Sequence, residues 1–153
     1  MKNFIAIIVL SCAVSACATV AVQPPGYRDL GTVAGVEVRV YSSYADLLRG
    51  LPPLVAAFFD TISRIYGRQW RLGGYYDQDK KIIHVLDNPA SLVHEFKHHL
   101  EPSWVHGFPI RPEDQGWRQV GPDKMFTLRG REFPVGDRES VESVMSRFKE
   151  IYD

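Results

Sequence analysis

The fold is organised around one predicted helix, whose sequence with its flanking residues is Asn88-Pro89-Ala90-Ser91-Leu92-Val93-His94-Glu95-Phe96-Lys97-His98-His99-Leu100-Glu101-Pro102. Asparagine is a favoured N-cap residue and proline is favoured at the first helical position, so we expect the helix to begin at Pro89. Proline cannot continue a helix, so Pro102 ends it near Glu101. The apolar residues of the stretch lie on a side that can face a core: Leu92, Val93, Phe96 and Leu100.

The same helix carries the pattern His-Glu-x-x-His at His94, Glu95 and His98. Residues four apart on a helix lie on one face, one turn apart, so both imidazoles can reach one zinc ion at ~2.0–2.1 Å. Glu95 is adjacent to the first histidine, where its carboxylate can reach a water on the metal. The pattern therefore predicts a Zn2+ site with His94 and His98 as ligands and Glu95 as the catalytic base of a hydrolase.

This motif resembles that of the zincin metallopeptidases, and the order of elements from Pro53 to Asp153 is similar to that of the small gluzincin-like members. The resemblance implies an α+β fold: a small zincin-like domain with a few-stranded sheet, an active-site helix and a C-terminal helix. It also implies hydrolysis of amide bonds in a peptide or protein substrate. The metzincin variant needs glycine at position 101 and histidine at position 104, where this chain has Glu101 and Trp104.

The gluzincin resemblance implies that the third zinc ligand is a glutamate on a downstream helix, and Glu139 matches that position. Such a helix is predicted over residues 137–152. The acidic residue that the family often has four positions later is Ser143 here, so the partner that orients His94 must come from elsewhere. Other candidates for the third ligand remain open: Glu142, His106, Glu101 and Glu113.

Apolar periodicity and turn residues predict the other elements of the domain. Helices are expected over residues 44–48 and 53–66, the second ending at Gly67. Strands are expected over residues 36–41, 69–72 and 81–86, and a hairpin over 125–133. These elements together predict one small α+β domain over residues 36–153.

The first residues have the three parts of an export signal: Lys2, an apolar run over residues 4–10, and small residues before a cysteine. The stretch Val14-Ser15-Ala16-Cys17 resembles the lipobox of bacterial lipoproteins. The resemblance implies a signal peptide over residues 1–16, a lipid on Cys17 and a tether over residues 17–35. The chain is then expected to be a lipid-anchored membrane protein of the bacterial cell envelope, in the outer membrane or on the periplasmic face.

Composition narrows the function further. The chain has 153 residues, with 18 Lys+Arg against 18 Asp+Glu, and this balance argues against a nucleic-acid partner. The leading hypothesis is a zinc metallopeptidase anchored to the envelope. The alternative is a non-catalytic metal-binding envelope lipoprotein with a structural or partner-binding role, because a domain of about 120 residues leaves little room for a deep cleft.

Overall fold

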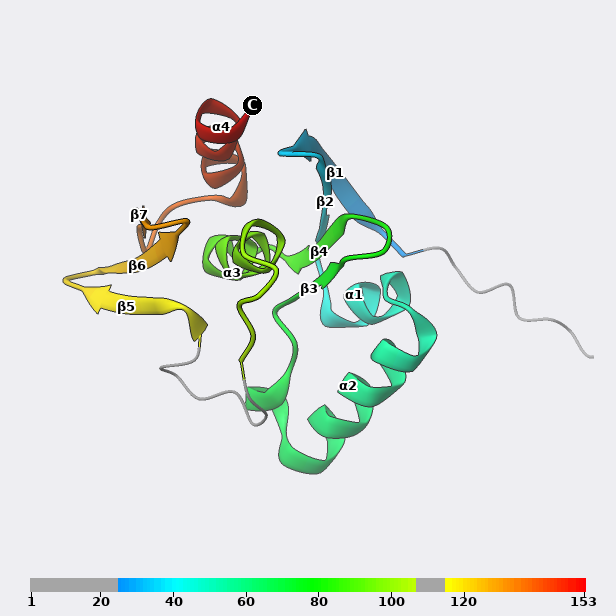
Figure 1. The fold of residues 1–153 in the computed structure, drawn as a ribbon. Helices are drawn as coiled ribbons and strands as arrows, with labels where there is room; N and C mark the ends of the chain where they lie inside the picture. The colour runs from blue at the N-terminus through cyan, green and yellow to red at the C-terminus, as the bar shows by residue number, and fades with distance from the viewer. Residues whose placement is uncertain (1–24, 107–114) are drawn as a thin grey trace, which may run out of the picture.

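The computed structural model describes residues 25–106 and 115–153, which form four α-helices and two small sheets (Figure 1). The predicted α+β class is confirmed. The helices are α1 (Tyr44–Gly50), α2 (Pro53–Tyr66), α3 (Pro89–Leu100) and α4 (Val141–Tyr152), with a 3-10 turn η1 (Arg68–Trp70). The strands are β1 (Tyr27–Val33), β2 (Val36–Tyr41), β3 (Gly74–Asp77), β4 (Ile82–Leu86), β5 (Trp117–Val120), β6 (Asp123–Leu128) and β7 (Arg131–Val135).

The first sheet has the strand order β1-β2-β4-β3, and the second has the order β5-β6-β7. β2 and β4 are parallel, while β3 pairs antiparallel with β4 at the edge of the sheet. Helix α3 lies between the two sheets, with α4 beside it (Figure 1). The candidate site is therefore carried by the central helix of the fold and not by a peripheral loop.

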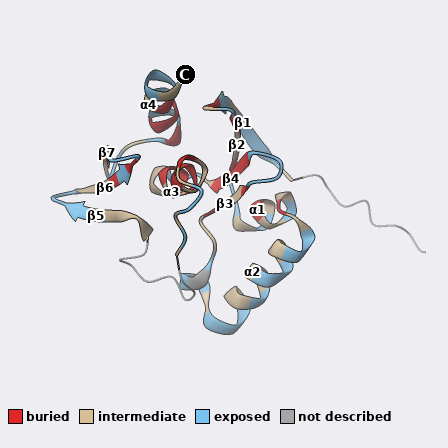
Figure 2. Cartoon of the chain, in the orientation of Figure 1, coloured by how far each residue is buried: buried red, intermediate tan, exposed pale blue. Residues whose placement is uncertain are grey.

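The core is formed where α3, α4 and both sheets meet. Phe96 of α3, Phe133 of β7 and Phe148 of α4 are all buried, and the Phe148 ring centroid lies 4.1 Å from that of Phe96 and 4.7 Å from that of Phe133. The predicted apolar side of α3 is confirmed, since Leu92, Val93, Phe96 and Leu100 are buried (Figure 2). This packing holds α3 in place and so determines where its other side, which carries His94 and His98, lies in the domain.

The tether predicted over residues 17–35 is wrong at its C-terminal end, because residues 27–33 form β1. The strand was hidden by an irregularity: the pairing register with β2 shifts between Asp29 and Thr32, where Gly31 adopts a φ of +83°. Such a bulge breaks the alternation of apolar and polar residues that marks a strand in a sequence. The domain therefore begins before residue 36.

The strand predicted over residues 69–72 is also wrong. Residues 68–70 form η1, and the strand β3 begins at Gly74. The space around Gly74 explains why this strand begins with glycine. A Cβ atom at Gly74 would lie 2.7 Å from Cγ of Glu95, so only glycine lets β3 approach α3 this closely.

Candidate metal centre

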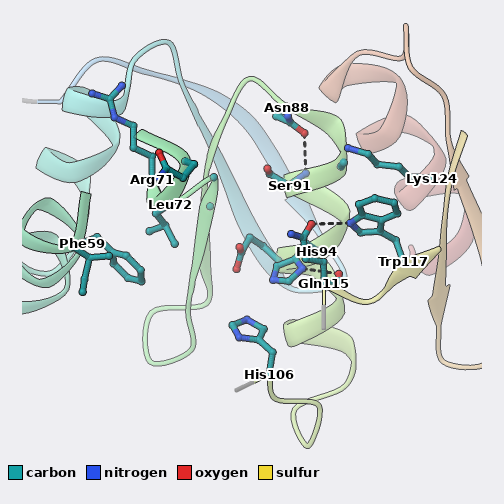
Figure 3. Close-up of a pocket in the computed structure, with 16 residues that line it drawn as sticks. Phe59, Arg71, Leu72, Asn88, Ser91, His94, His106, Gln115, Trp117 and Lys124 are labelled. Atoms are coloured by element: carbon teal, nitrogen blue, oxygen red, sulfur yellow. Dashed lines mark hydrogen bonds between the residues drawn. The ribbon is translucent and has the colours of Figure 1, made fainter. Parts of the chain in front are cut away.

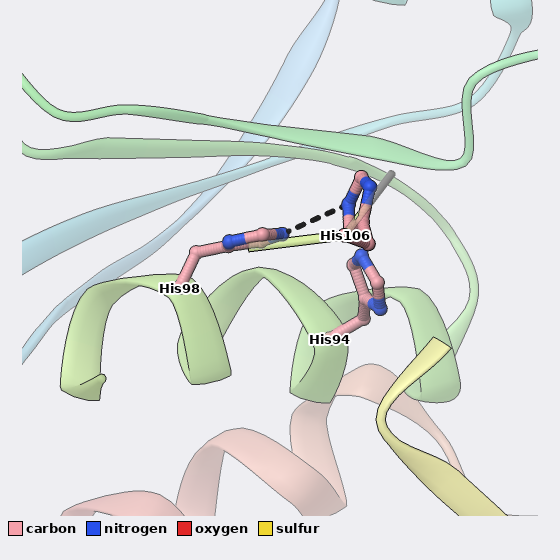
Figure 4. A group of neighbouring side chains, drawn as sticks. All are labelled: His94, His98 and His106. Atoms are coloured by element: carbon pink, nitrogen blue, oxygen red, sulfur yellow. Dashed lines mark hydrogen bonds between the residues drawn. The ribbon is translucent and has the colours of Figure 1, made fainter. Parts of the chain in front are cut away.

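His94 and His98 project from the same side of α3, as the spacing predicts (Figure 4). The helix begins where expected, since the Asn88 side chain accepts a hydrogen bond from the Ser91 backbone N–H and Pro89 occupies the first turn. The ring centroids of the two histidines are 5.1 Å apart. The helix itself therefore holds the two imidazoles close together.

His106 joins this pair from the chain that follows α3. The chain turns at once after the helix, with the Trp104 backbone N–H donating to the Glu101 carbonyl at 2.8 Å. This turn brings Nε2 of His106 to 3.2 Å from Nε2 of His98. One ligand nitrogen from each of His94, His98 and His106 lies within 4.8 Å of the others, so the three histidines could hold a metal ion (Figure 4).

The separation of the His98 and His106 nitrogens suits a tetrahedral ion. Two nitrogens bound at ~2.0–2.1 Å with a tetrahedral angle lie about 3.3 Å apart, and the His98–His106 separation is 3.2 Å. The Nδ1 atom of His94 lies 2.9 Å from the Gln115 carbonyl oxygen. A carbonyl only accepts, so Nδ1 carries the proton and Nε2 is left with its lone pair for a metal.

The surroundings of His94 and His98 favour the neutral imidazole, which is the form that binds a metal. Burial lowers the pKa of His98 to about 4, and the neighbouring His94 and His106 lower it further. Burial also lowers the pKa of His94, although its hydrogen bond to the Gln115 backbone opposes the shift. Little proton competition at these two ligands is therefore expected near pH 7.

Glu139, the predicted third ligand, does not belong to this histidine group. Its carboxylate accepts hydrogen bonds from Arg147 at 2.8 Å, from the Ser143 hydroxyl at 2.9 Å and from the Gly136 backbone N–H at 3.2 Å. Glu139 also precedes α4, which is capped by Ser140 and begins at Val141. These contacts give Glu139 a structural role at the start of α4, and His106 takes the third place.

The other acidic candidates are also engaged elsewhere. Glu142 pairs with Arg28 of β1. Glu101 accepts from Nζ of Lys97 and from the Arg129 backbone N–H, both at 2.6 Å. Glu113 lies outside the described residues. Among the residues that the structure describes, only His106 completes a group of three with His94 and His98.

Glu95 is 6% exposed and lines the cavity beside the histidines. Burial raises the pKa of its carboxyl to about 8, and a hydrogen bond from the Tyr76 backbone N–H opposes this rise. Its side chain lies against Gly74, whose backbone carries no Cβ that would displace it. The edge of the first sheet therefore holds this carboxyl next to His94.

A cavity of about 520 Å3 is lined by His94, His106 and Glu95. Figure 3 shows Phe59 and Leu72 on one side of it, Trp117 and Lys124 on the other, and His94 between them. The prediction that a small domain has little room for a cleft is therefore wrong for this chain. The space is gained because the second sheet stands apart from α2, on the other side of α3 (Figure 1).

Several of these residues have no signal in the sequence. Trp104 packs on the histidines, with its ring centroid 4.6 Å from that of His98, and Nζ of the buried Lys97 lies 5.1 Å from the Trp104 centroid. Gln115 contributes only its backbone carbonyl, which no residue-type pattern can reveal.

Comparison with known proteins gives no relative: no family model matches the chain, and no curated protein or solved structure is significantly similar to it. Within residues 25–106 and 115–153, no helix has both the length and the apolar character needed to cross a membrane. The function therefore has to be inferred from the side chains of the site.

Proposed function

We propose that the chain is a zinc-dependent hydrolase of peptide bonds, with His94, His98 and His106 as metal ligands and Glu95 as general base. The observation that carries the proposal is a buried carboxyl on the wall of a cavity that His94 and His106 also line, with His98 completing the group of three imidazoles. A structural zinc site is closed by four protein ligands, whereas a catalytic site has three and keeps a position open. The three-histidine group beside a cavity matches the second kind.

Zinc suits this donor set, because imidazole nitrogens are typical zinc ligands. When bound, zinc would lower the pKa of a coordinated water towards ~7 and polarise a substrate carbonyl. Glu95 would take a proton from the attacking water and pass it to the leaving amine nitrogen. Burial raises the pKa of the Glu95 carboxyl to about 8, which makes its carboxylate form a stronger proton acceptor than that of an exposed glutamate.

The edge strand β3 offers a place for an extended peptide. The Gly73 carbonyl oxygen accepts a hydrogen bond from the Leu86 backbone N–H of β4, at 2.9 Å. Because backbone groups alternate along a strand, those of Gly74 and Tyr76 point to the open edge, and the Tyr76 N–H indeed meets Glu95. Gly74 lines the cavity, so a substrate strand could pair there and bring a peptide bond to Glu95.

The variant Glu95→Gln tests the proposed function. Removing the proton acceptor is expected to lower zinc-dependent cleavage of a mixed-sequence fluorogenic peptide library by about 10²–10⁴-fold. Zinc content, measured by elemental analysis, should stay at the wild-type value because no metal ligand changes. Glu139→Gln is the matched control and should cleave at close to the wild-type rate.

Two results would contradict the proposal. One is cleavage by Glu95→Gln at the wild-type rate. The other is wild-type protein that binds zinc but cleaves no member of the library, which would favour the alternative of a non-catalytic metal-binding lipoprotein.

The variant Gly74→Ala tests whether the edge strand positions Glu95. A Cβ at this position would lie 2.7 Å from Cγ of Glu95, so the carboxyl must shift. A displacement of about 1 Å can cost roughly 100-fold in rate, and we expect a loss of that order with unchanged zinc content. In Gly136→Ala the new Cβ meets nothing closer than 3.6 Å, and this control should retain activity. Equal cleavage rates for Gly74→Ala and Gly136→Ala would contradict a role of β3 in positioning Glu95.

We also propose that Cys17, outside the described residues, carries a lipid that anchors the chain to the bacterial envelope. The support is the sequence of residues 1–17, with its apolar run and its small residues before the cysteine. Cells fed a palmitate analogue should label the wild-type chain but not Cys17→Ala, and the variant should leave the membrane fraction. Labelling of both chains would contradict the anchor.

A further inference from the structure

Helix α2 presents a stripe of large apolar side chains to solvent. No residue of α2 is buried, and Figure 2 shows the helix without any buried segment. Leu54 is 86% exposed, Ile65 is 65% exposed and Phe58 is 50% exposed. At 100° per residue these three positions fall within about 40° of one another around the helix. We call Leu54, Phe58 and Ile65 the α2 stripe.

The rest of the apolar surface of α2 is used inside the domain. Val55 and Ala56 pack against the small core cluster that contains Tyr41 and Leu47. Phe59 and Ile62 line the cavity beside the metal centre. The α2 stripe is therefore not the side by which the helix is held to the domain, and it lies next to the cavity wall around the helix circumference.

The chain enters the domain close to this helix. Gly26 makes a backbone hydrogen bond to Asp46 of α1, and Tyr44 of α1 donates its hydroxyl to the Phe59 carbonyl of α2 at 3.2 Å. Gly26 is only nine positions after Cys17, and nine residues span at most about 30 Å. A bilayer that holds a lipid at Cys17 is therefore within reach of α2.

The charge of this region suits an anionic bilayer. Residues 44–71 contain four arginines and two aspartates, although the whole chain has a net charge of zero. Arg49 and Arg64 pair with these two aspartates, so the excess positive charge is carried by Arg68 and Arg71, which follow α2. A surface helix with apolar side chains flanked by basic ones binds at the boundary between headgroups and acyl chains.

We propose that α2 lies in the headgroup region of the membrane to which the chain is anchored, with the α2 stripe inserted towards the acyl chains. The proposal rests on the lipid anchor at Cys17 but not on the hydrolase activity. Because the neighbouring side of α2 lines the cavity, this docking turns the site towards the bilayer surface. Substrate segments that lie close to the membrane would then reach it first.

Fluorescence quenching in vesicles tests the proposal. The full-length lipidated chain would carry a bimane label at Leu54→Cys or Ile65→Cys, with Val120→Cys and Ile151→Cys as controls at other exposed apolar positions. The vesicles would contain phosphatidylethanolamine, phosphatidylglycerol and a nitroxide-labelled phosphatidylcholine. The lipidated chain without an introduced cysteine, labelled in parallel, gives the background signal.

The labels at 54 and 65 are expected to lose about half of their fluorescence or more, since an interfacial helix buries its apolar face ~5–10 Å deep. The labels at 120 and 151 should keep theirs. Protein that floats with the vesicles while all four labels stay bright would overturn the proposal and leave the anchor intact. Protein that does not float would overturn both, and the peptide-cleavage assay in detergent would still decide the hydrolase function. Disulfide cross-linking through Leu54→Cys, without quenching by lipid, would show a second copy on the stripe and also overturn the proposal.

Discussion

Replacing His106 by alanine is expected to weaken zinc binding at least about 100-fold and to abolish peptide cleavage. Loss of a residue that merely orients a ligand already costs about 10–100-fold in metal affinity, and His106 itself contributes one of the three clustered nitrogens. The measurement is zinc affinity by competition with a chromophoric chelator, together with cleavage of the peptide library. His106 is 3.2 Å from His98 and not on α3, so the helix should remain folded.

The matched controls for His106→Ala are the acidic residues that the sequence offered for the same place. Glu139→Gln and Glu142→Gln should bind zinc as the wild type does, because their carboxylates pair with Arg147 and Arg28. A large loss of zinc affinity in Glu139→Gln, with none in His106→Ala, would reverse the assignment.

Phe148→Ala is expected to lower the free energy of unfolding by about 3–5 kcal/mol, the usual cost of removing a buried phenylalanine side chain. Phe148 is 0% exposed and stacks on Phe96 of α3 and Phe133 of β7. The cavity left behind would loosen three elements at once. Since small domains are stable by only about 5–15 kcal/mol, the effect should be plain in urea unfolding.

Ile151→Ala is the control for Phe148→Ala on the same helix. Ile151 is 43% exposed, so its truncation should change the free energy of unfolding by less than about 1 kcal/mol. Similar unfolding midpoints for the two variants would mean that the three phenylalanines do not form the central core.

The parts of the site that depend on local sequence could be predicted. The cap at Asn88, the apolar side of α3 and the four-residue spacing of His94 and His98 all follow from helix geometry, and the structure confirms each. The third histidine was named only as one alternative. Its position depends on how the chain turns back after α3, which is decided by the Trp104–Glu101 hydrogen bond and by tertiary packing.

The errors concern contacts that the local sequence does not reveal. Glu139 matched a family pattern, but its carboxylate pairs with Arg147 of α4. Gly74 pairs with Val85 in β3, and it is glycine because Glu95 occupies the space where a Cβ would be. The strand β1 was hidden by the bulge at Gly31.

The most direct test of the proposed metal centre is an anomalous-difference map, collected at the zinc absorption edge from crystals of the zinc-loaded protein. We predict one strong peak with a nitrogen of each of His94, His98 and His106 at ~2.0–2.1 Å, facing the cavity beside Glu95. A peak bound by His94, His98 and a carboxylate such as Glu139, or no peak near the histidines, would contradict it.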